Sequence, residues 1–244
     1  MTGEIGLDDM ADLTTDLPAH DFWQEMHPAG SFPLHNDFTS FYVAELEDGR
    51  QLRLPLRVMA DGRHALASLI VNQASFEVLD ALAERLADKL GPLNIDVVVG
   101  LPTLGLTLAS ALAQKLGHTR YVPLGTSRKF WYRDDLSVPL SSITTPTQQK
   151  RLYIDPRMLP LLEGRRVALI DDVISSGTSI LSGLELLSTC SVEPAAIGAA
   201  MLQSERWREK LASAGPQWLD RTVGVFSTPL LERTGGGSWR CPGA

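Results

Sequence analysis

Two adjacent carboxylates followed by a run of small hydroxyl residues stand out in the segment RRVALIDDVISSGTS. Asp171 and Asp172 come directly after residues 166–170, which we predict to form a buried strand. In open parallel α/β sheets, ligands bind at the carboxyl ends of strands, where these acids would lie. The small residues after them let the backbone turn tightly, and free N–H groups at the start of a following helix suit a phosphate. Further donors would be the hydroxyls of Ser175, Ser176, Thr178 and Ser179.

The two carboxylates are unsuited to a phosphate but well suited to a sugar. Asp171 and Asp172 can accept hydrogen bonds from neighbouring sugar hydroxyls, while the loop 175–179 would hold the phosphate. Together these residues predict a ribose 5-phosphate site. Alternatively, the acids cap a helix or form the acidic pocket of a receiver domain, and Ser-Gly-Thr is an ordinary turn. The order of strand, acids and small-residue loop favours the sugar-phosphate site.

A repeated order of short apolar strand, turn and helix surrounds this motif. It predicts an α/β fold, a doubly wound parallel sheet with right-handed crossovers. The expected strands are 95–100, 120–124, 165–172 and 195–202, and the expected helices are 106–117 and 178–189. The acid pair would then lie at the ligand-binding edge of this sheet.

Ahead of this core, the sequence predicts strands and one long helix. Residues 41–58 alternate around an Asp-Gly pair at 48–49, which is the pattern of a β-hairpin. Ser75 opens an amphipathic helix that ends at the Gly-Pro pair 91–92. Its apolar positions follow helical spacing and are Phe76, Leu79, Leu82, Ala83 and Leu86.

Two stretches interrupt this order. Residues 125–149 are polar and interrupted by proline, which predicts a long functional loop that contributes no core element. The tail after Ser204 holds aromatic residues without a clear period, so we expect an irregular cap that is loose from Gly235 onward. The resulting layout is a flexible leader, N-terminal strands, an α/β core and a C-terminal cap or hood, at residues 1–20, 21–74, 75–205 and 206–244.

The acid pair and its loop resemble the binding motif for 5-phosphoribosyl 1-pyrophosphate (PRPP) in type I phosphoribosyltransferases. The resemblance extends over residues 70–205 in the order that the fold of that family requires. It implies that Asp171 and Asp172 bind the ribose 2′- and 3′-hydroxyls. The residues that would wrap the 5′-phosphate are Ser175, Ser176, Gly177, Thr178 and Ser179.

Further segments extend the resemblance. DVVVGLPTLG is similar to the first strand and pyrophosphate loop of the family, and the loop residues here are Pro102, Thr103, Leu104 and Gly105. RYVPLGTSRKFWY is similar to the strand that enters a flexible catalytic loop, with Arg128 and Lys129 at basic positions of adenine phosphoribosyltransferases. QKRLYID is similar to the strand by which that loop returns. Without the resemblance, residues 102–105 are an ordinary strand-to-helix turn and the two basic residues are solvated charges.

The resemblance implies a transferase in which a ring nitrogen displaces magnesium pyrophosphate from the anomeric carbon of PRPP. Mg²⁺ would be bound mainly through the pyrophosphate, and no protein residue is assigned as its ligand. Arg128 and Lys129 would stabilise the departing pyrophosphate. The second substrate would be a small nitrogen acceptor, with a purine-type base favoured. A hood that includes Trp218 and Phe226 would cover this base.

The acceptor stays open because each branch of the family has features that this chain lacks. The hypoxanthine-guanine branch carries an acid in the phosphate loop where this chain has Ser175. The adenine branch often carries Glu and Arg in the pyrophosphate loop, and LPTLG has neither, although the loop after Gly125 is more similar to that branch. The orotate branch shares the DDVI start. One alternative is a PRPP- or nucleotide-sensing regulatory protein with the same fold; another, a P-loop kinase, would need GKS or GKT, which the sequence lacks.

Composition restricts the partners and the compartment. The formal net charge of −7 argues against nucleic acid or an anionic membrane as the main partner, and no helix-turn-helix signature or basic stripe is visible. Cys190 and Cys241 supply neither a disulfide framework nor a zinc site, so we expect a reducing cytoplasm. The sequence shows no signal peptide and no apolar run of transmembrane length. The resemblance implies a homodimer.

Overall fold

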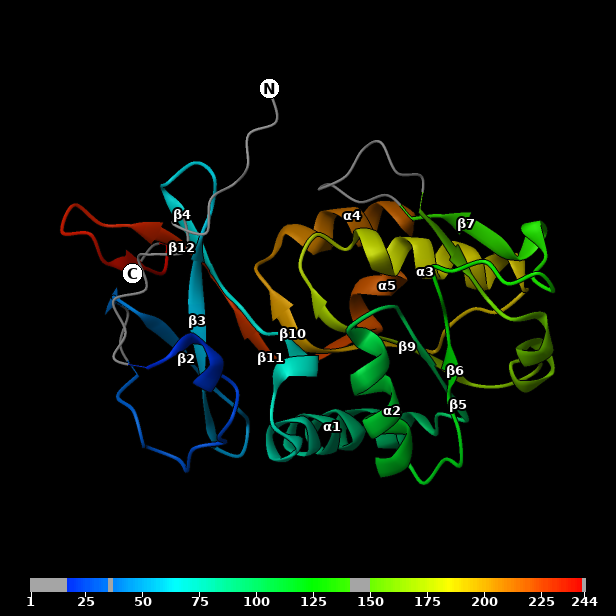
Figure 1. Ribbon diagram of the computed structural model, residues 1–244, viewed down its shortest axis with the longest axis horizontal. Helices are drawn as coiled ribbons and strands as arrows, with labels where there is room; N and C mark the ends of the chain where they lie inside the picture. Colours follow the sequence, from blue (N-terminus) through cyan, green and yellow to red (C-terminus); the bar gives the residue numbers. More distant parts are fainter. Residues whose placement is uncertain (1–16, 35–36, 141–149, 243–244) are drawn as a thin grey trace.

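A five-stranded parallel sheet forms the centre of the protein in the computed structural model, which describes residues 17–34, 37–140 and 150–242 (Figure 1). Its strands lie in the order β11–β10–β9–β5–β6, and every neighbouring pair is parallel. The strands are β5 (Val97–Gly100), β6 (Val122–Pro123), β9 (Val167–Ile174), β10 (Ala196–Gln203) and β11 (Thr222–Thr228). The central strand, β9, carries the acid pair.

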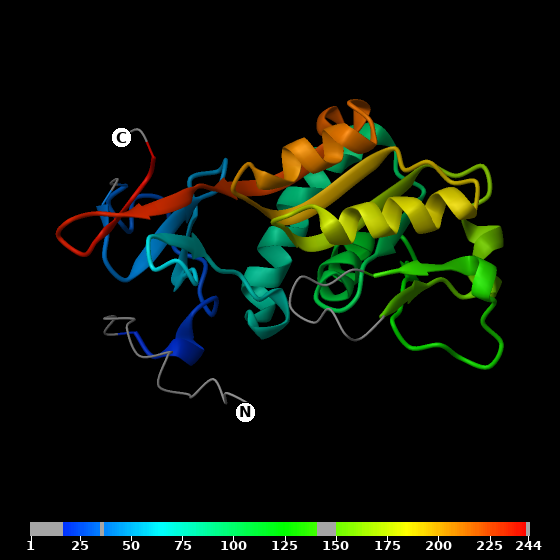
Figure 2. The ribbon, with the colours of Figure 1, turned by 90° about the horizontal axis from the view of Figure 1, so that it is seen from above.

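A second, antiparallel sheet lies at one end of the parallel sheet (Figure 1, Figure 2). Its order is β1–β13–β12–β4–β3–β2. The predicted hairpin is confirmed, because β2 and β3 pair from Phe41 opposite Pro55 to Glu45 opposite Gln51, and Gly49 takes a φ of +84° in the turn. The strands are β1 (Asp37–Phe38), β2 (Phe41–Glu45), β3 (Gln51–Val58), β4 (His64–Ala67), β12 (Leu230–Arg233) and β13 (Trp239–Arg240).

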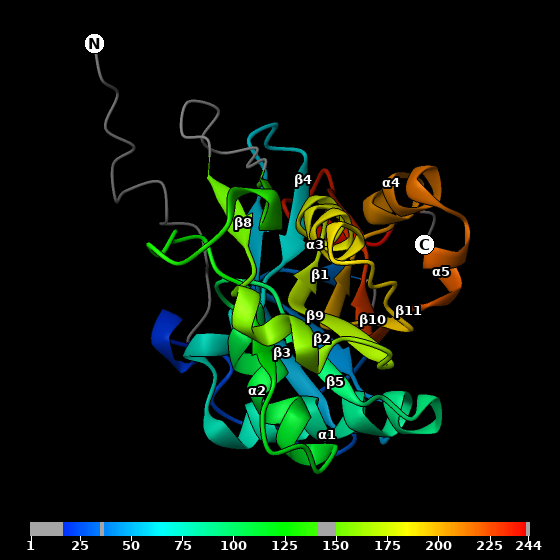
Figure 3. The same ribbon diagram turned by 90° about the vertical axis from the view of Figure 1, so that its right-hand side faces the viewer.

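Helices cover both faces of the parallel sheet, α1 and α2 on one face and α3, α4 and α5 on the other (Figure 3). They are α1 (Phe76–Leu90), α2 (Gly105–Lys115), α3 (Thr178–Thr189), α4 (Arg206–Ala214) and α5 (Gln217–Asp220). Successive side chains of a strand point to opposite faces, so Ala168 and Ile170 of β9 pack on the α1–α2 side and Leu169 packs on the α3 side. The predicted doubly wound fold is therefore confirmed.

Helix α1 follows the predicted amphipathic pattern with one exception. The hydroxyl of Ser75 caps it by accepting a hydrogen bond from the N–H of Val78 at 3.1 Å. Leu82 and Leu86 are fully buried, as expected from their spacing. Phe76 is 88% exposed, however, so the buried stripe of this helix begins only at Val78.

The segment after Ser204 is regular, and the expectation of an irregular cap is wrong. Helices α4 and α5 bury Trp207 and Trp218 against the sheet. Strand β11 extends the parallel sheet past the predicted boundary at residue 205. Beyond Gly235, β13 pairs with β1 and β12, so this end of the chain is fixed in a sheet rather than loose.

The two sheets are joined through the C-terminal segment. Only Pro229 separates β11 from β12, so the chain passes directly from the parallel sheet into the antiparallel one. Leu54 of β3, Leu231 of β12 and Leu86 of α1 belong to one buried apolar cluster. The antiparallel sheet is therefore packed onto the α/β core.

The long loop after β6 contains a small antiparallel strand pair beside α3, made by β7 (Ser137–Pro139) and β8 (Arg151–Tyr153). Leu136 and Val138 are buried in the apolar cluster under α3, so the prediction that 125–149 contributes no core element is wrong there. Residues 141–149 lie outside the described residues, as do residues 1–16 of the predicted leader.

Short 3₁₀ helices connect several of these elements, at Ala19–Asp21, Val71–Gln73, Gly91–Leu93, Asp134–Leu136 and Pro156–Leu161. Within the described ranges, no helix combines the length and apolar composition needed to cross a membrane.

Candidate active site

Asp171 and Asp172 lie in β9 where its neighbour β5 stops. The last pair between these two strands joins Gly100 to Ile170, so both acids extend beyond β5. On its other side β9 continues along β10 as far as Ile174. The strand thus continues two residues beyond the expected end at residue 172, because β10 still provides backbone hydrogen-bonding partners for β9.

Both carboxyl groups are nearly buried, and each acid is 8% exposed. The backbone N–H of Asp172 donates to Oδ1 of Asp171 at 3.0 Å. Burial raises the pKa of Asp171 well above its usual range, and the charge of Asp172 adds to this effect. Burial also raises the pKa of Asp172. Negative charge is costly here unless a ligand donates hydrogen bonds to it, so the pair suits the hydroxyl groups of a sugar.

The predicted pyrophosphate loop, residues 102–105, lies directly against this pair. A Cβ added to Gly105 would come within 2.8 Å of Oδ1 and 2.9 Å of Cα of Asp171, so only glycine allows so close an approach. The loop follows β5 and leads into α2, which begins at Gly105. The peptide bond between Pro102 and Thr103 is cis, and Thr103 is exposed. The structure thus brings this loop and the acid pair together.

The predicted phosphate loop, residues 175–179, joins β9 to α3 and turns at Gly177, whose φ is +76°. A Cβ on Gly177 would lie 2.7 Å from a side-chain carbon of Leu211, so α4 packs closely beneath the loop. Helix α3 begins at Thr178, whose N–H donates to Oγ of Ser176 at 3.5 Å, and the N–H groups of its first turn have no partner within the helix. Of the loop hydroxyl residues, Ser179 is exposed, and the half-buried ones are Ser175, Ser176 and Thr178.

Two basic side chains of α4 reach this loop, and neither was predicted from the sequence. Nη2 of Arg206 donates to Oγ of Ser175 at 3.0 Å, and Nζ of Lys210 donates to Oγ1 of Thr178 at 2.7 Å. A spacing of four residues places both side chains on one face of the helix. That spacing is visible in the sequence, but nothing local indicates that the helix lies against the loop.

The basic residues of the predicted catalytic loop lie elsewhere. Nε of Arg128 pairs with Oδ1 of Asp134 at 3.1 Å, and Lys129 is exposed. Nε1 of Trp131 donates to Oδ2 of Asp155 at 3.2 Å, which attaches the loop to the segment after β8. Figure 2 shows this part of the chain, in green, extending outward from the parallel sheet. The structure does not bring these two basic residues to the acid pair.

Neither aromatic residue predicted for the base hood is placed to stack on a base. Trp218 is 8% exposed in α5, just before β11 begins, and so lies at the amino end of the sheet, opposite the acid pair. Phe226 is 7% exposed and packs in the core on the α1 side. We therefore correct both assignments, because both rings are used for packing within the protein.

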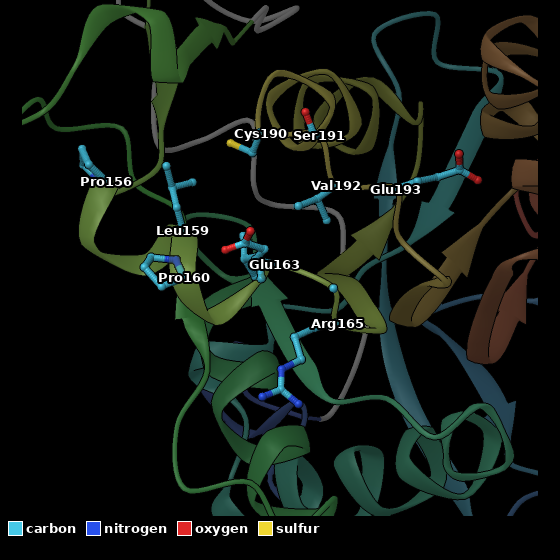
Figure 4. Close-up of a pocket in the computed structure, with 11 residues that line it drawn as sticks. Pro156, Leu159, Pro160, Glu163, Arg165, Cys190, Ser191, Val192 and Glu193 are labelled. Atoms are coloured by element: carbon cyan, nitrogen blue, oxygen red, sulfur yellow. The ribbon is translucent and has the colours of Figure 1, made fainter.

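Two hollows lie at opposite ends of the parallel sheet. One, of about 570 Å³, includes Arg165 and Val192, which precede β9 and β10, so it lies away from the acid pair (Figure 4). The other, of about 600 Å³, lies at the carboxyl ends of β10 and β11 and includes Arg206 and Thr228. Because Arg206 also contacts Ser175, this second hollow adjoins the phosphate loop. Within the described residues, the buried hydroxyl of Thr228 has no hydrogen-bonding partner there.

A parallel sheet whose central strand carries an acid pair beside two anion-suited loops is an α/β arrangement suited to a sugar phosphate. Residues 67–228 match the model of a family described as the phosphoribosyl transferase domain. The match covers more than half of the chain, and the chain belongs to the phosphoribosyltransferase family.

Curated relatives match a similar part of the chain. Orotate phosphoribosyltransferase of Halorhodospira halophila is 30% identical over 141 residues, covering 57% of this chain and 57% of the relative. Bifunctional protein PyrR of Streptomyces coelicolor is 32% identical over 134 residues, covering 54% of this chain and 65% of the relative. The chain therefore spans less than two thirds of the length of each of these two relatives.

A solved structure shares the fold. It is that of an adenine phosphoribosyltransferase from Giardia lamblia complexed with 9-deazaadenine, with a TM-score of 0.54 and 20% identity over 77% of this chain and 93% of that chain. At this level of identity the similarity concerns the fold alone.

Proposed function

We propose that the protein is a PRPP-dependent phosphoribosyltransferase, which transfers the 5-phosphoribosyl group to a ring nitrogen of a purine-type base and releases pyrophosphate. One observation carries the proposal: the acid pair, the loop 102–105 and the loop 175–179 converge at the carboxyl ends of the neighbouring strands β5 and β9. Family membership supports the reaction class. The similarity of the loop after Gly125 to the adenine branch favours a purine.

The chemistry at this site is a displacement at the anomeric carbon of PRPP. The lone pair of the acceptor nitrogen forms the new C–N bond while the C–O bond to pyrophosphate breaks, and the bonding electrons leave with the pyrophosphate oxygen. The nitrogen then loses its proton to water. In our proposal Asp171 and Asp172 accept hydrogen bonds from the ribose hydroxyls, and the loops 175–179 and 102–105 hold the phosphate and the pyrophosphate. The protein would act by positioning and by electrostatic stabilisation.

A magnesium ion fits this site as part of the substrate. Mg²⁺ prefers oxygen ligands and keeps several waters, and it is commonly bound through substrate phosphates together with one or two carboxylates. The nearly buried carboxyl groups of Asp171 and Asp172 supply oxygen at the site. We propose that the pyrophosphate of PRPP provides most of the ligands, and that the ion would neutralise charge on the leaving group.

The loop with Arg128 and Lys129 would have to rearrange before these residues could act on pyrophosphate. Arg128 would exchange its contact with Asp134 for the leaving group, and Trp131 would release Asp155. Closure of this kind excludes water from the reacting carbon. We therefore propose that both basic residues act in a closed form.

The decisive experiment is a screen of free bases with PRPP and Mg²⁺, read as pyrophosphate release. We expect release with one purine or a related ring, and none with the folded Asp171→Asn/Asp172→Asn variant. PRPP binding without release from any base would contradict a transferase and favour a PRPP-sensing regulatory protein.

We further propose a cytoplasmic homodimer. The free thiols of Cys190 and Cys241 suit a reducing compartment, and analytical ultracentrifugation would test the assembly state.

A further inference from the structure

Helix α4 presents two cations to the loop that we propose binds the 5′-phosphate. Arg206 contacts the hydroxyl of Ser175 at 3.0 Å, and Lys210 contacts the hydroxyl of Thr178 at 2.7 Å. These two loop residues lie on either side of the turn at Gly177. The cations therefore approach the loop at both of its ends.

The direction of these hydrogen bonds decides what the hydroxyls can do next. Arginine and lysine side chains only donate, so the oxygens of Ser175 and Thr178 act as acceptors in both contacts. Each hydroxyl keeps one hydrogen for a further partner. For Thr178 one such partner lies within the loop, because its Oγ1 is 3.1 Å from Oγ of Ser176 and either hydroxyl can donate to the other. A phosphate group is an acceptor, and hydrogen bonds to it are strengthened by its charge. The contacts from α4 thus leave the hydrogen of Ser175 for an anion, and that of Thr178 for an anion or for Ser176.

Packing fixes α4 in this position. Trp207 and Leu211 are buried under the loop, and a Cβ on Gly177 would come within 2.7 Å of Leu211. They follow Arg206 and Lys210 by one residue each, so the same turns that bury the apolar side chains direct the cations at the loop. The approach is therefore part of the fold.

The charges of α4 are divided between two roles. Arg208 pairs with Glu205 of the preceding turn, with Nε 3.1 Å from Oε2, and its guanidinium lies 5.2 Å from the ring centre of Trp207. Arg206 and Lys210 contact neutral hydroxyls of the loop. In a chain with a formal net charge of −7, this places two positive charges at one loop.

We propose that Arg206 and Lys210 are positioning residues for the 5′-phosphate of PRPP, which act by orienting the hydroxyls of Ser175 and Thr178 and by adding positive charge to the loop. The proposal rests on the proposed function of the loop 175–179. In this proposal, helix α4 contributes to a 5′-phosphate site that is otherwise built from the end of β9 and the start of α3.

The test compares three single variants of the full chain. Arg206→Met and Lys210→Met remove a cation that faces the loop, and Arg208→Met removes one from the same helix that does not. Titration calorimetry with ribose 5-phosphate should show the dissociation constant rising about tenfold for each of the first two variants and staying unchanged for Arg208→Met. Binding of inorganic pyrophosphate should stay unchanged in all three, because its loop lies on the β5 side. Lys210→Arg should restore most of the affinity.

Kinetics and a double variant separate positioning from a purely structural role. With PRPP and the base found in the screen, KM for PRPP should rise and kcat should change little, because the 5′-phosphate is remote from the reacting carbon. Lys210→Met should cost less affinity in a Thr178→Val background than in the wild type, since the part of its effect that passes through that hydroxyl is already lost.

Three outcomes would overturn the inference. These are unchanged ribose 5-phosphate affinity in folded Arg206→Met and Lys210→Met proteins, an equal loss of affinity for pyrophosphate, and full additivity with Thr178→Val. A wild-type protein that binds neither ribose 5-phosphate nor PRPP would instead overturn the proposed function itself.

Discussion

At the scale of single residues, Asp171 and Asp172 combine near-complete burial with a proposed role as hydrogen-bond acceptors for a sugar. Burial raises the pKa of both carboxyl groups. The protein without ligand therefore carries the electrostatic cost of two adjacent acids, and sugar hydroxyls that donate to them would relieve it. The stability of the ligand-free protein should therefore depend on pH, and binding of the substrate should increase it.

We predict that Asp171→Asn/Asp172→Asn raises the melting temperature of the ligand-free protein at pH 7. When a carboxyl group has a higher pKa in the folded protein than in the unfolded chain, its protonated form stabilises the fold. This contribution is fully present at pH values below the unfolded pKa. It is lost as pH rises through the folded pKa. The two amide side chains of the variant carry no charge at any of these pH values, so the variant avoids this loss. Each kcal/mol recovered is worth about 2–4 °C in a chain of this size.

Differential scanning calorimetry at pH 7 and near pH 4 measures this effect, with Asp220→Asn as an exposed control. The difference between variant and wild type should shrink toward pH 4, and PRPP should no longer raise the melting temperature of the variant. A variant less stable than the wild type at pH 7 would contradict the account.

The sequence predicts the placement of those candidate site residues that are contiguous along the chain. Asp171, Asp172 and the loop 175–179 form one uninterrupted segment, so their order alone indicated their geometry. Arg206 and Lys210 reach the same loop from positions 31 and 32 residues away, and such contacts depend on how a later helix packs. Trp218 and Phe226 were assigned wrongly because composition does not distinguish an aromatic ring that faces a ligand from one that fills the core.

At the scale of elements, the loop after β6 combines a fixed part with an exposed one. Leu136 and Val138 are buried beside α3, whereas Arg128 and Lys129 lie on the exposed part. The contact between Trp131 and Asp155 holds the exposed part away from the acid pair. Any contribution of the basic residues to catalysis therefore depends on a movement of this part alone.

We predict that Arg128→Ala/Lys129→Ala lowers kcat roughly hundredfold and changes the dissociation constant of PRPP only a few fold. The reason is that both residues would act on charge that develops on the departing pyrophosphate, which is an effect on the transition state. Steady-state kinetics together with calorimetry give the two quantities. Arg133→Ala, which removes another cation of this loop, is the matched control. Equal losses in kcat and in PRPP binding would indicate simple charge attraction.

Element prediction succeeded where a periodic pattern is long. Residues 41–58 and 76–90 gave a hairpin and a helix that the structure contains. The strand TVGVFST and the helix RWREKLASA are short and include glycine or charged residues. Their hydrophobic periodicity is therefore too weak to distinguish them from the flanking sequence. Strand β11 is stabilised by its pairing with β10, and this pairing cannot be predicted from the residues of β11 alone.

At the scale of the whole molecule, the C-terminal segment belongs to both sheets. Strand β11 closes one edge of the parallel sheet, and β12 lies between β4 and β13 in the antiparallel sheet. Trp207, Leu211 and Trp218 complete the core under α3. The segment after residue 205 and the α/β core are therefore one structural unit.

We predict that a chain ending at Ser204 loses its cooperative fold, because it exposes the core under α3 and leaves one edge of β10 and one edge of β4 unpaired. Circular dichroism during heating should show no sharp transition, in contrast to the full chain. A truncated protein that melts cooperatively near the temperature of the wild type would show instead that the segment is an accessory.

The strand order β1–β13–β12–β4–β3–β2 also has a consequence for biosynthesis. The ribosome releases β2, β3 and β4 well before β12 and β13, because the whole α/β core lies between them in the chain. During that interval the edge of β4 presents unpaired backbone groups to any other extended chain in the cell. We therefore expect the nascent protein to need protection by chaperones until β12 and β13 have been synthesised.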